Sequence, residues 1–586
     1  MALSGASSSI AKTANTPPAH PAGEMPRDDF QQSPVLLQSQ GYIYPNKDPI
    51  LLGYLFESSM ASKAPLGRPH FRTSQQRTRH RKIVNSIMTM DLDPVQDLKG
   101  ALRNDFFHGY ATAAPQIEGA WNKDGKGPSI WDTFGHLPGK VKDNSTADDT
   151  VRSYDLYRED VALMKSYGVN AYRFSLSWSR IIPLGGADDP INEQGIKFYQ
   201  DLIEELLRND ITPFVTLFHW DVPQALEDRY GGMLNQERFV PDFVRYARVC
   251  FERLGPRVRH WITFNEPGVY SLAGYAAGVH APARSSYRDR NAEGDSSTEP
   301  FIVGHTELVA HGHVSKLYRE EFQPQQRGTI GITLHGNWSE PWDMDDERDQ
   351  KTAERAREFE IAWFADPLYK TGDYPASMRA QLGDRLPHFT PEESALVLGS
   401  SEFYGMNSYT TFFVQHNRDP PDINDHKGNV IVHDTNSKGV SRGEESDTHW
   451  LRMAPAGWRK LLNWIWNRYH MPIYVTENGT TVKGETAPTP EVLNDTFRMR
   501  FFEGYVGGLA RAVKEDGVDI RSYFAWTFTD NWGMSKSSKT PPVCKLTGCR
   551  MGRGLHGSIR EHVCGFRLCR EDSVSEAVGI LFEGAV

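Results

Sequence analysis

Short apolar runs along the chain alternate with longer stretches in which apolar residues recur every three or four positions. The short runs are rich in β-branched and aromatic residues, which is typical of buried strands, and the longer stretches are typical of amphipathic helices. Strands are expected over 106–112, 170–176, 212–218, 259–265, 328–334, 401–407, 472–477 and 521–527. Helices are expected over 153–167, 196–208, 239–254, 458–469 and 495–514. Eight strands that alternate with helices predict an α/β fold, a (β/α)₈ TIM barrel.

Three segments depart from this pattern. Residues 1–99 are rich in Pro, Ser and Gln, so we expect a disordered extension. The basic stretch 71–82 suggests a targeting or anchoring arm, but translation from a wrong start upstream of Met88 or Met90 is the simpler interpretation. The polar stretch 417–448 should be a surface loop. We therefore divide the chain into an extension (1–99), a barrel (100–532) and a tail (533–586).

Two of the predicted strands end in a glutamate. Residues 473–479 read Ile-Tyr-Val-Thr-Glu-Asn-Gly, and residues 261–267 read Trp-Ile-Thr-Phe-Asn-Glu-Pro. Asn-Gly and Pro stop the strands, which leaves Glu477 and Glu266 at strand ends. Either glutamate alone is as often a solvated residue as a functional one. Two at one barrel mouth match the pair of carboxyls that glycosidic-bond cleavage requires.

The same residues carry a family resemblance. Residues 263–267 and 476–479 resemble the two signatures of glycoside hydrolase family 1, the β-glucosidases and their relatives, and residues 107–120 are similar to the family's N-terminal signature. The resemblance runs from about 106 to 531 and is nearest to the intracellular enzymes of fungi. It implies that Glu477 is the nucleophile, that Glu266 is the general acid and base, and that cleavage retains the anomeric configuration.

Further site residues are expected at the ends of the other strands. Amide and imidazole groups there suit a hexose because its hydroxyls both donate and accept hydrogen bonds. Arg173 would keep Glu477 ionised, and Tyr409 would orient the same carboxylate. By resemblance, Asn265 holds the sugar 2-hydroxyl, and Trp526 would lie against the apolar sugar face. The predicted substrate-binding residues are Gln116, His219, Trp220, Asn265, Asn407, Tyr409 and Trp526.

Composition narrows the choice of partners. The net charge of −10 argues against a general nucleic-acid binder. The chain lacks an apolar run of about eighteen residues, which argues against a membrane span, and its N-terminus lacks the apolar core of a secretory signal, so a cytoplasmic enzyme is expected. The predicted partner is a small β-glucoside or a short oligosaccharide, with no metal and no cofactor. The oligomeric state stays open.

The tail departs from the family after Trp532. Members continue with Glu-Trp, a Gly-Tyr turn and Arg-Phe-Gly, whereas this chain reads Gly-Met-Ser-Lys over 533–536. Codons chosen for 550–560 and shifted by one nucleotide can restore that motif, and the codons at 533–535 and 549–550 can form splice sites. We therefore expect a retained intron with a frameshift, and a last barrel helix that is missing or replaced.

The four tail cysteines would then have no function. A zinc site is disfavoured because their spacing is wider than in usual zinc motifs; they are Cys544, Cys549, Cys564 and Cys569. The leading functional prediction is a retaining β-glucosidase that acts on terminal, non-reducing β-D-glucosyl residues. A phospho-β-glycosidase and a sugar-binding pseudoenzyme, inactive because of its altered C-terminus, remain as alternatives.

Overall fold

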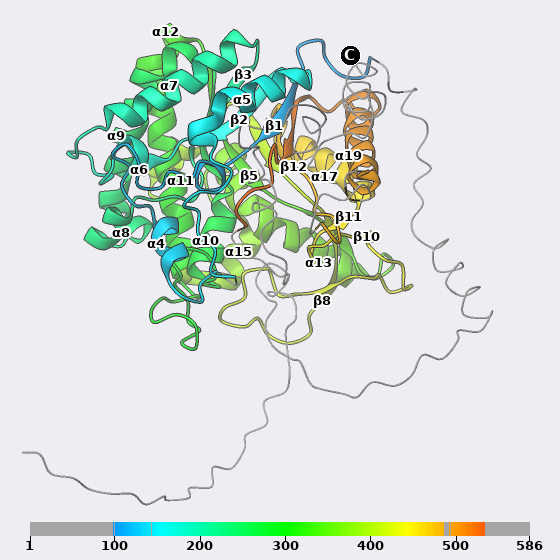
Figure 1. Ribbon diagram of the computed structural model, residues 1–586. Coiled ribbons are helices and arrows are strands. Elements are labelled where there is room, and N and C mark those ends of the chain that lie inside the picture. Colours follow the sequence, from blue (N-terminus) through cyan, green and yellow to red (C-terminus); the bar gives the residue numbers. More distant parts are fainter. Residues whose placement is uncertain (1–97, 99, 142, 486–491, 493, 534–586) are drawn as a thin grey trace, which may run out of the picture. The chain divides into compact units, whose positions relative to one another are not determined.

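A computed structural model describes residues 98, 100–141, 143–485, 492 and 494–533. Its centre is a closed barrel of eight parallel strands, so the predicted TIM barrel is confirmed (Figure 1). Each strand lies where an apolar run predicts one. The strands are β1 (Phe107–Ala111), β2 (Ala171–Ser175), β3 (Thr212–Phe218), β4 (His260–Asn265), β5 (Thr329–His335), β7 (Tyr404–Asn407), β12 (Ile473–Asn478) and β13 (Ile520–Trp526).

The strands follow one another around the barrel in chain order, and β13 closes the ring on β1. In that closing pair, Phe107 lies opposite Ser522 and Ala111 lies opposite Trp526. Because the strands are parallel, their carboxyl ends meet at one mouth. Of the predicted extension only Leu98 is described, and it is buried in the core. The basic stretch, the four tail cysteines and the tail after Gly533 lie outside the described residues.

Helices cover the outside of the barrel, and the five predicted ones are present. In α7 (Glu193–Arg208), Tyr199, Ile203 and Leu206 are fully buried along one face, as the apolar periodicity requires. Helices α17 (Pro455–Tyr469) and α19 (Thr496–Lys514), which directly precede β12 and β13 in the chain, lie side by side (Figure 1). The main helices are α5 (Ser153–Ser166), α7 (Glu193–Arg208), α9 (Gln236–Arg253), α11 (Glu299–Leu317), α13 (Glu347–Arg357), α17 (Pro455–Tyr469) and α19 (Thr496–Lys514).

Shorter helices occupy the connections. A π-helix, η5 (Glu358–Ala362), joins α13 to α14 (Trp363–Tyr369). The other short helices are α3 (Ala114–Ile117), α4 (Ile130–His136), α6 (Trp178–Ile181), α8 (Gln224–Tyr230), α10 (Pro267–Tyr275), α12 (Gln323–Gln326), α15 (Ala376–Leu382) and α16 (Pro391–Val397).

Apolar side chains fill the interior of the barrel. Phe214, Ile262, Phe403 and Phe524 form a buried cluster contributed by several strands. The ring of Phe214 stacks on His260 with 4.1 Å between the ring centroids. The interior is therefore a packed core rather than a pore, and an active site is expected at the mouth formed by the carboxyl ends of the strands.

The segment 417–448 is not the plain surface loop that its composition predicts. It contains β9 (Val430–His433), which pairs antiparallel with β8 (Thr411–His416), and β8 pairs with β6 (Trp338–Pro341). Val430 and Val432 pack against a small buried cluster. The apolar run here, Val430-Ile431-Val432, is only three residues long within a polar stretch, which is shorter than the runs that predict strands. A two-stranded ladder, β10 (Glu444–Glu445) with β11 (Arg452–Met453), completes this region.

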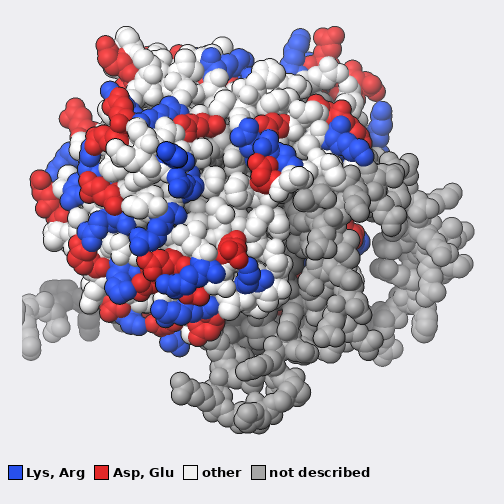
Figure 2. Space-filling view, turned by 90° about the horizontal axis from the view of Figure 1, so that it is seen from above, with Lys and Arg blue, Asp and Glu red and all other residues white. Residues whose placement is uncertain are grey.

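Charged side chains of both signs are interspersed on the face of the molecule shown in Figure 2. The described part of that face carries no extended patch of one sign. Across the described ranges, none of the helices combines the length and the apolar character that crossing a membrane requires.

Candidate active site

Irregular strand ends position the two glutamates. The pairing register shifts in β4 between Ile262 and Asn265, and in β12 between Val475 and Glu477. Such bulges re-aim side chains, and they are common beside active sites. Glu266 directly follows β4 in a left-handed conformation with φ of 46°, and Pro267 then starts α10 at the first helical position, where proline is favoured. Both carboxyls consequently lie at the barrel mouth.

Glu477 is held by two donors. Arg173 Nη1 donates to Glu477 Oε1 over 2.6 Å, and the Tyr409 hydroxyl donates to Oε2 over 2.6 Å. Arg173 is also fixed by the Thr476 carbonyl at 3.0 Å. Arg173 and Glu477 are almost fully buried, with side chains 1% and 4% exposed, so water does not screen this ion pair.

Opposing effects set the pKa of Glu477. Burial is the largest and raises the pKa, because the charged carboxylate loses its hydration. Arg173 lowers the pKa, as its charge predicts, and so does the hydrogen bond from Tyr409, whereas the neighbouring charge of Glu266 raises it. The net direction is upward. Glu477 therefore relies on Arg173 and Tyr409 to remain ionised near neutral pH.

Glu266 has a different environment. Asn407 Nδ2 donates to Glu266 Oε1 over 2.8 Å, and His335 Nδ1 lies 3.6 Å from the same oxygen. The other ring nitrogen of His335, Nε2, lies 3.1 Å from Glu360 Oε1. Burial lowers the pKa of His335, but its two carboxylate neighbours outweigh burial and raise the pKa to about 10. An imidazolium therefore faces Glu266.

Asn265 links the two glutamates. Its Oδ1 accepts hydrogen bonds from Arg173 Nη2 and from Asn407 Nδ2, the latter over 3.1 Å. Its Nδ2 lies 3.1 Å from His219 Nε2, and its carbonyl accepts from Trp220 Nε1 over 2.8 Å. Burial and the charge of Arg173 lower the pKa of His219 well below its usual value, so the ring is neutral. Nε2 then accepts from the Asn265 amide, which leaves the proton on Nδ1.

Trp526 and Gln116, the two remaining predicted residues, differ in whether they contact the residues around the glutamates. The indole of Trp526 stacks on His219, with 5.8 Å between ring centroids and 18° between the planes. Gln116 follows β1 in α3, but its amide donates to the Trp532 carbonyl over 3.1 Å and to Asn531 Oδ1 over 3.3 Å. Gln116 is therefore tied to the segment after β13, and its hydrogen bonds do not reach either glutamate.

Sequence analysis missed His335 and Glu360. His335 is the last residue of β5, so the expectation that polar residues at strand ends belong to the site could have identified it. Glu360 lies on the π-helix η5, where no periodic pattern marks it. Nowhere in the described ranges do three or more His, Cys, Asp or Glu residues form a group that could hold a metal ion.

Comparison with known proteins agrees with this geometry. The model of glycosyl hydrolase family 1 matches residues 98–540. Beta-glucosidase 1B of Phanerodontia chrysosporium is 53% identical over 429 residues, which cover 73% of this chain and 78% of that protein. Beta-glucosidase 24 of Oryza sativa subsp. japonica is 45% identical over 437 residues, or 73% of this chain and 86% of that protein.

Solved structures lead to the same family. The β-glucosidase from Trichoderma harzianum is 51% identical with a TM-score of 0.71, and the match covers 74% of this chain and 90% of that one. A family 1 β-glucosidase from Humicola insolens, in complex with glucose, is 50% identical with a TM-score of 0.73. This match covers 75% of this chain and 93% of that one. The predicted resemblance is confirmed: the chain belongs to glycosyl hydrolase family 1, and it is an enzyme that hydrolyses glycosidic bonds.

Proposed function

We propose that the protein is a retaining β-glucosidase that removes terminal, non-reducing β-D-glucosyl residues by double displacement. The observation that carries the proposal is the contrast between the two buried carboxyls: Glu477 is paired with a guanidinium, and Glu266 is not. The names of the relatives support the choice of glucose. A rice β-glucosidase mutant, 40% identical to this chain, was solved in a covalent complex with Glc, which supports the proposed intermediate.

In the first step, the Glu477 carboxylate attacks the anomeric carbon of the substrate. Glu266 gives its proton to the glycosidic oxygen, the bond from carbon to oxygen breaks, and the aglycone leaves as an alcohol. Arg173 and Tyr409 direct the Glu477 oxygens toward this attack. Retaining chemistry requires about 5–5.5 Å between the two carboxyls.

In the second step, Glu266, now a carboxylate, takes a proton from water. The water oxygen attacks the anomeric carbon and displaces Glu477, so two inversions give net retention. The His335 ring lies beside Glu266, with Nδ1 3.6 Å from Oε1.

The residues around the glutamates would bind the sugar. Asn265, positioned by four neighbours, would hold the 2-hydroxyl. His219 Nδ1 is a buried donor that has no partner among the described residues, so it is available to a sugar hydroxyl. Trp526 would lie under the apolar ring face. Gln116, Trp220, Asn407 and Tyr409 would complete the pocket. The cytoplasmic location and the tail with a retained intron remain predictions from the sequence.

The test is hydrolysis of an aryl β-glucoside, with the anomer of the released glucose followed by NMR. The 586-residue chain and a version with the family reading frame restored after residue 532 should be assayed side by side. We expect β-glucose to appear first, and initial release of α-glucose would contradict the proposal. Preference for 6-phosphoglucosides would favour the phospho-β-glycosidase alternative. Activity of the restored form alone would favour the pseudoenzyme that is inactive because of its altered C-terminus, and inactivity of both forms would contradict the proposal.

A further inference from the structure

A chain of buried hydrogen bonds links the strand that carries Glu477 to the other glutamate. Thr476, the residue before Glu477 on β12, donates from its hydroxyl to Asn407 Oδ1 over 2.7 Å. Asn407 in turn donates from Nδ2 to Glu266 Oε1 over 2.8 Å. Both Thr476 and Asn407 are fully buried. The Thr476 hydroxyl is therefore two hydrogen bonds away from Glu266, in a place that bulk water does not reach.

An irregularity in β12 brings this hydroxyl to the barrel mouth. Consecutive side chains of a regular strand point to opposite faces, so Thr476 would be expected to point away from the groups that hold Glu477. The pairing of β12 with β7 shifts its register between Val475 and Glu477. A shift of this kind re-aims side chains, and here both Thr476 and Glu477 bond to residues of the mouth.

Arg173 determines which groups of this chain donate and which accept. A guanidinium only donates, so the atom of Asn265 that faces Arg173 Nη2 is its oxygen, Oδ1. The atom of Asn407 that lies 3.1 Å from this oxygen is then the nitrogen, Nδ2, which leaves the Asn407 oxygen facing Thr476. Thr333 donates to the Thr476 hydroxyl oxygen over 3.2 Å, so the hydrogen of Thr476 is left for Asn407. The Asn407 amide is therefore oriented from both of its ends.

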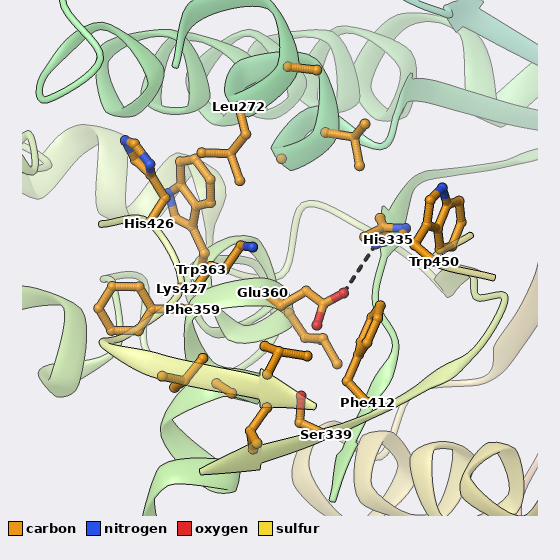
Figure 3. A pocket seen from close by; sticks show the side chains of 18 of the residues that line it. Leu272, His335, Ser339, Phe359, Glu360, Trp363, Phe412, His426, Lys427 and Trp450 are labelled. Carbon is orange, nitrogen blue, oxygen red and sulfur yellow. Dashed lines mark ion pairs between the residues drawn. The ribbon is translucent and has the colours of Figure 1, made fainter. Parts of the chain in front are cut away.

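His335 and Asn407 both direct hydrogens at one oxygen of Glu266. Asn407 Nδ2 donates to Oε1, and the His335 imidazolium brings Nδ1 to 3.6 Å from the same atom. Figure 3 shows His335 with its ion-pair partner Glu360 in the wall of a largely apolar cavity of about 540 Å³. Across the described ranges, no hydrogen bond reaches Glu266 Oε2. The proton of the acid form therefore belongs on Oε2, from which it can pass to the glycosidic oxygen.

We infer that Thr476 is a positioning residue for acid catalysis: its hydroxyl fixes the orientation of the Asn407 amide, and that orientation keeps the transferable proton of Glu266 on Oε2. The inference rests on the proposed role of Glu266 as the acid and adds the residue that controls where its proton lies. Thr476 touches neither the substrate nor Glu266, so it acts through Asn407 alone.

The alternative orientation of Asn407 shows why the hydroxyl matters. If the amide turned over, the Asn407 oxygen would face Glu266 Oε1 and would accept the carboxyl proton there. That proton would then be held by Asn407 instead of being offered to the substrate. The Thr476 hydroxyl opposes this turn, because its hydrogen would lose its acceptor and a buried donor without a partner is costly.

The first experiment compares Thr476→Val, which has nearly the shape of threonine but no hydroxyl, with Thr476→Ser, which keeps the hydroxyl. The readout is kcat/KM at the optimal pH of each variant, for cellobiose and for a dinitrophenyl glucoside. Only the alcohol that leaves from cellobiose needs a proton. We expect Thr476→Val to lower kcat/KM for cellobiose about tenfold and for the dinitrophenyl glucoside about twofold at most, since one buried hydrogen bond is lost. Thr476→Ser should recover most of the loss.

A series of aryl β-glucosides whose phenols differ in acidity sharpens this test. The logarithm of kcat/KM, plotted against the acidity of the departing phenol, has a slope that reports how much the acid assists departure. Thr476→Val should steepen the slope, and Thr476→Ser should keep it near that of the wild-type protein. Thr476→Ala, which also lacks the hydroxyl, should steepen the slope as well and replaces the valine variant if that variant does not fold.

Thr112→Val is the matched control. The Thr112 hydroxyl is also buried at a strand end and lies 2.6 Å from the Tyr172 hydroxyl, but this pair is not linked to either glutamate. Thr112→Val should leave the slope unchanged, and thermal unfolding shows that each variant is folded.

Equal losses for both substrates in Thr476→Val, an unchanged slope, or a serine variant as impaired as the valine variant would overturn the inference. Failure of the wild-type protein to hydrolyse either glucoside would instead contradict the proposed function. Glu266→Ala, measured on the same aryl series, checks separately that Glu266 is the acid. The three failures are therefore distinguishable.

Discussion

The ends of β4 and β12 are alike in sequence and different in environment. Each strand is apolar, each ends at a shifted register, and each delivers a buried glutamate to the same mouth. Glu477 is held at both oxygens, by Arg173 and by Tyr409. Glu266 accepts from Asn407 and faces His335, and its neighbours line a large apolar cavity.

This difference supports the proposed division of two chemical roles on one scaffold. A nucleophile must hold a fixed position and stay charged, which a guanidinium and a hydroxyl provide. A group that gives and takes a proton must alternate between charged and neutral forms, and it must lie beside the leaving group. Environment, rather than residue type, therefore assigns the roles. The following predictions test that contrast.

The largest effect is expected from removing the carboxyl of Glu477. Glu477→Gly should lower kcat by a factor on the order of 10⁶, because no second group can form the covalent intermediate. Azide should restore turnover by attacking from the vacated side, and the product should be the α-glucosyl azide. The measurement is product analysis by NMR. A β-glucosyl azide, or no rescue by azide or formate, would show that Glu477 is not the nucleophile.

Removing the second carboxyl should give a smaller loss that depends on the leaving group. Glu266→Ala should lower kcat/KM for cellobiose by about 10²–10⁴, because the departing alcohol needs a proton. A dinitrophenyl glucoside, whose phenolate leaves unaided, should lose far less. The alkaline limb of the pH profile should flatten as well. Equal losses for both substrates would contradict the role of Glu266 as the acid.

A subtler change concerns the hydrogen bond that Tyr409 donates to Glu477. This bond stabilises the carboxylate and lowers its pKa, so Tyr409→Phe should raise the pKa of Glu477. The acidic limb of kcat/KM should then move to higher pH, by up to about one unit, with activity lost at low pH and little changed above the limb. A shift to lower pH would contradict the assignment.

The smallest effect is expected from deleting the N-terminal segment. Deleting residues 1–87 should leave the melting temperature and kcat/KM nearly unchanged, since this segment has little apolar periodicity to bury. The full chain is the matched control, and thermal unfolding is the measurement. A loss of many degrees would show that the segment contributes to the stability of the barrel.

Much of this architecture could be predicted because barrel strands are buried on both faces. Such strands appear as near-continuous apolar runs, and all eight lie close to the predicted ranges. The strand β9 was not predicted because its apolar run, 430–432, spans only three residues within a polar segment. Glu360 was missed for a different reason: only the fold brings η5 to the end of β5.

The sequence by itself determined the order of strands and helices, the family, and which glutamates stand at strand ends. These properties are local, since periodicity and short motifs are set by neighbouring residues. Only the tertiary structure decided the distances at which Arg173 and Tyr409 contact Glu477, that the His335 ring lies between Glu266 and Glu360, and that an apolar cavity adjoins Glu266. Those properties depend on distances between strands far apart along the chain, and on burial, which strengthens the interactions between their charges.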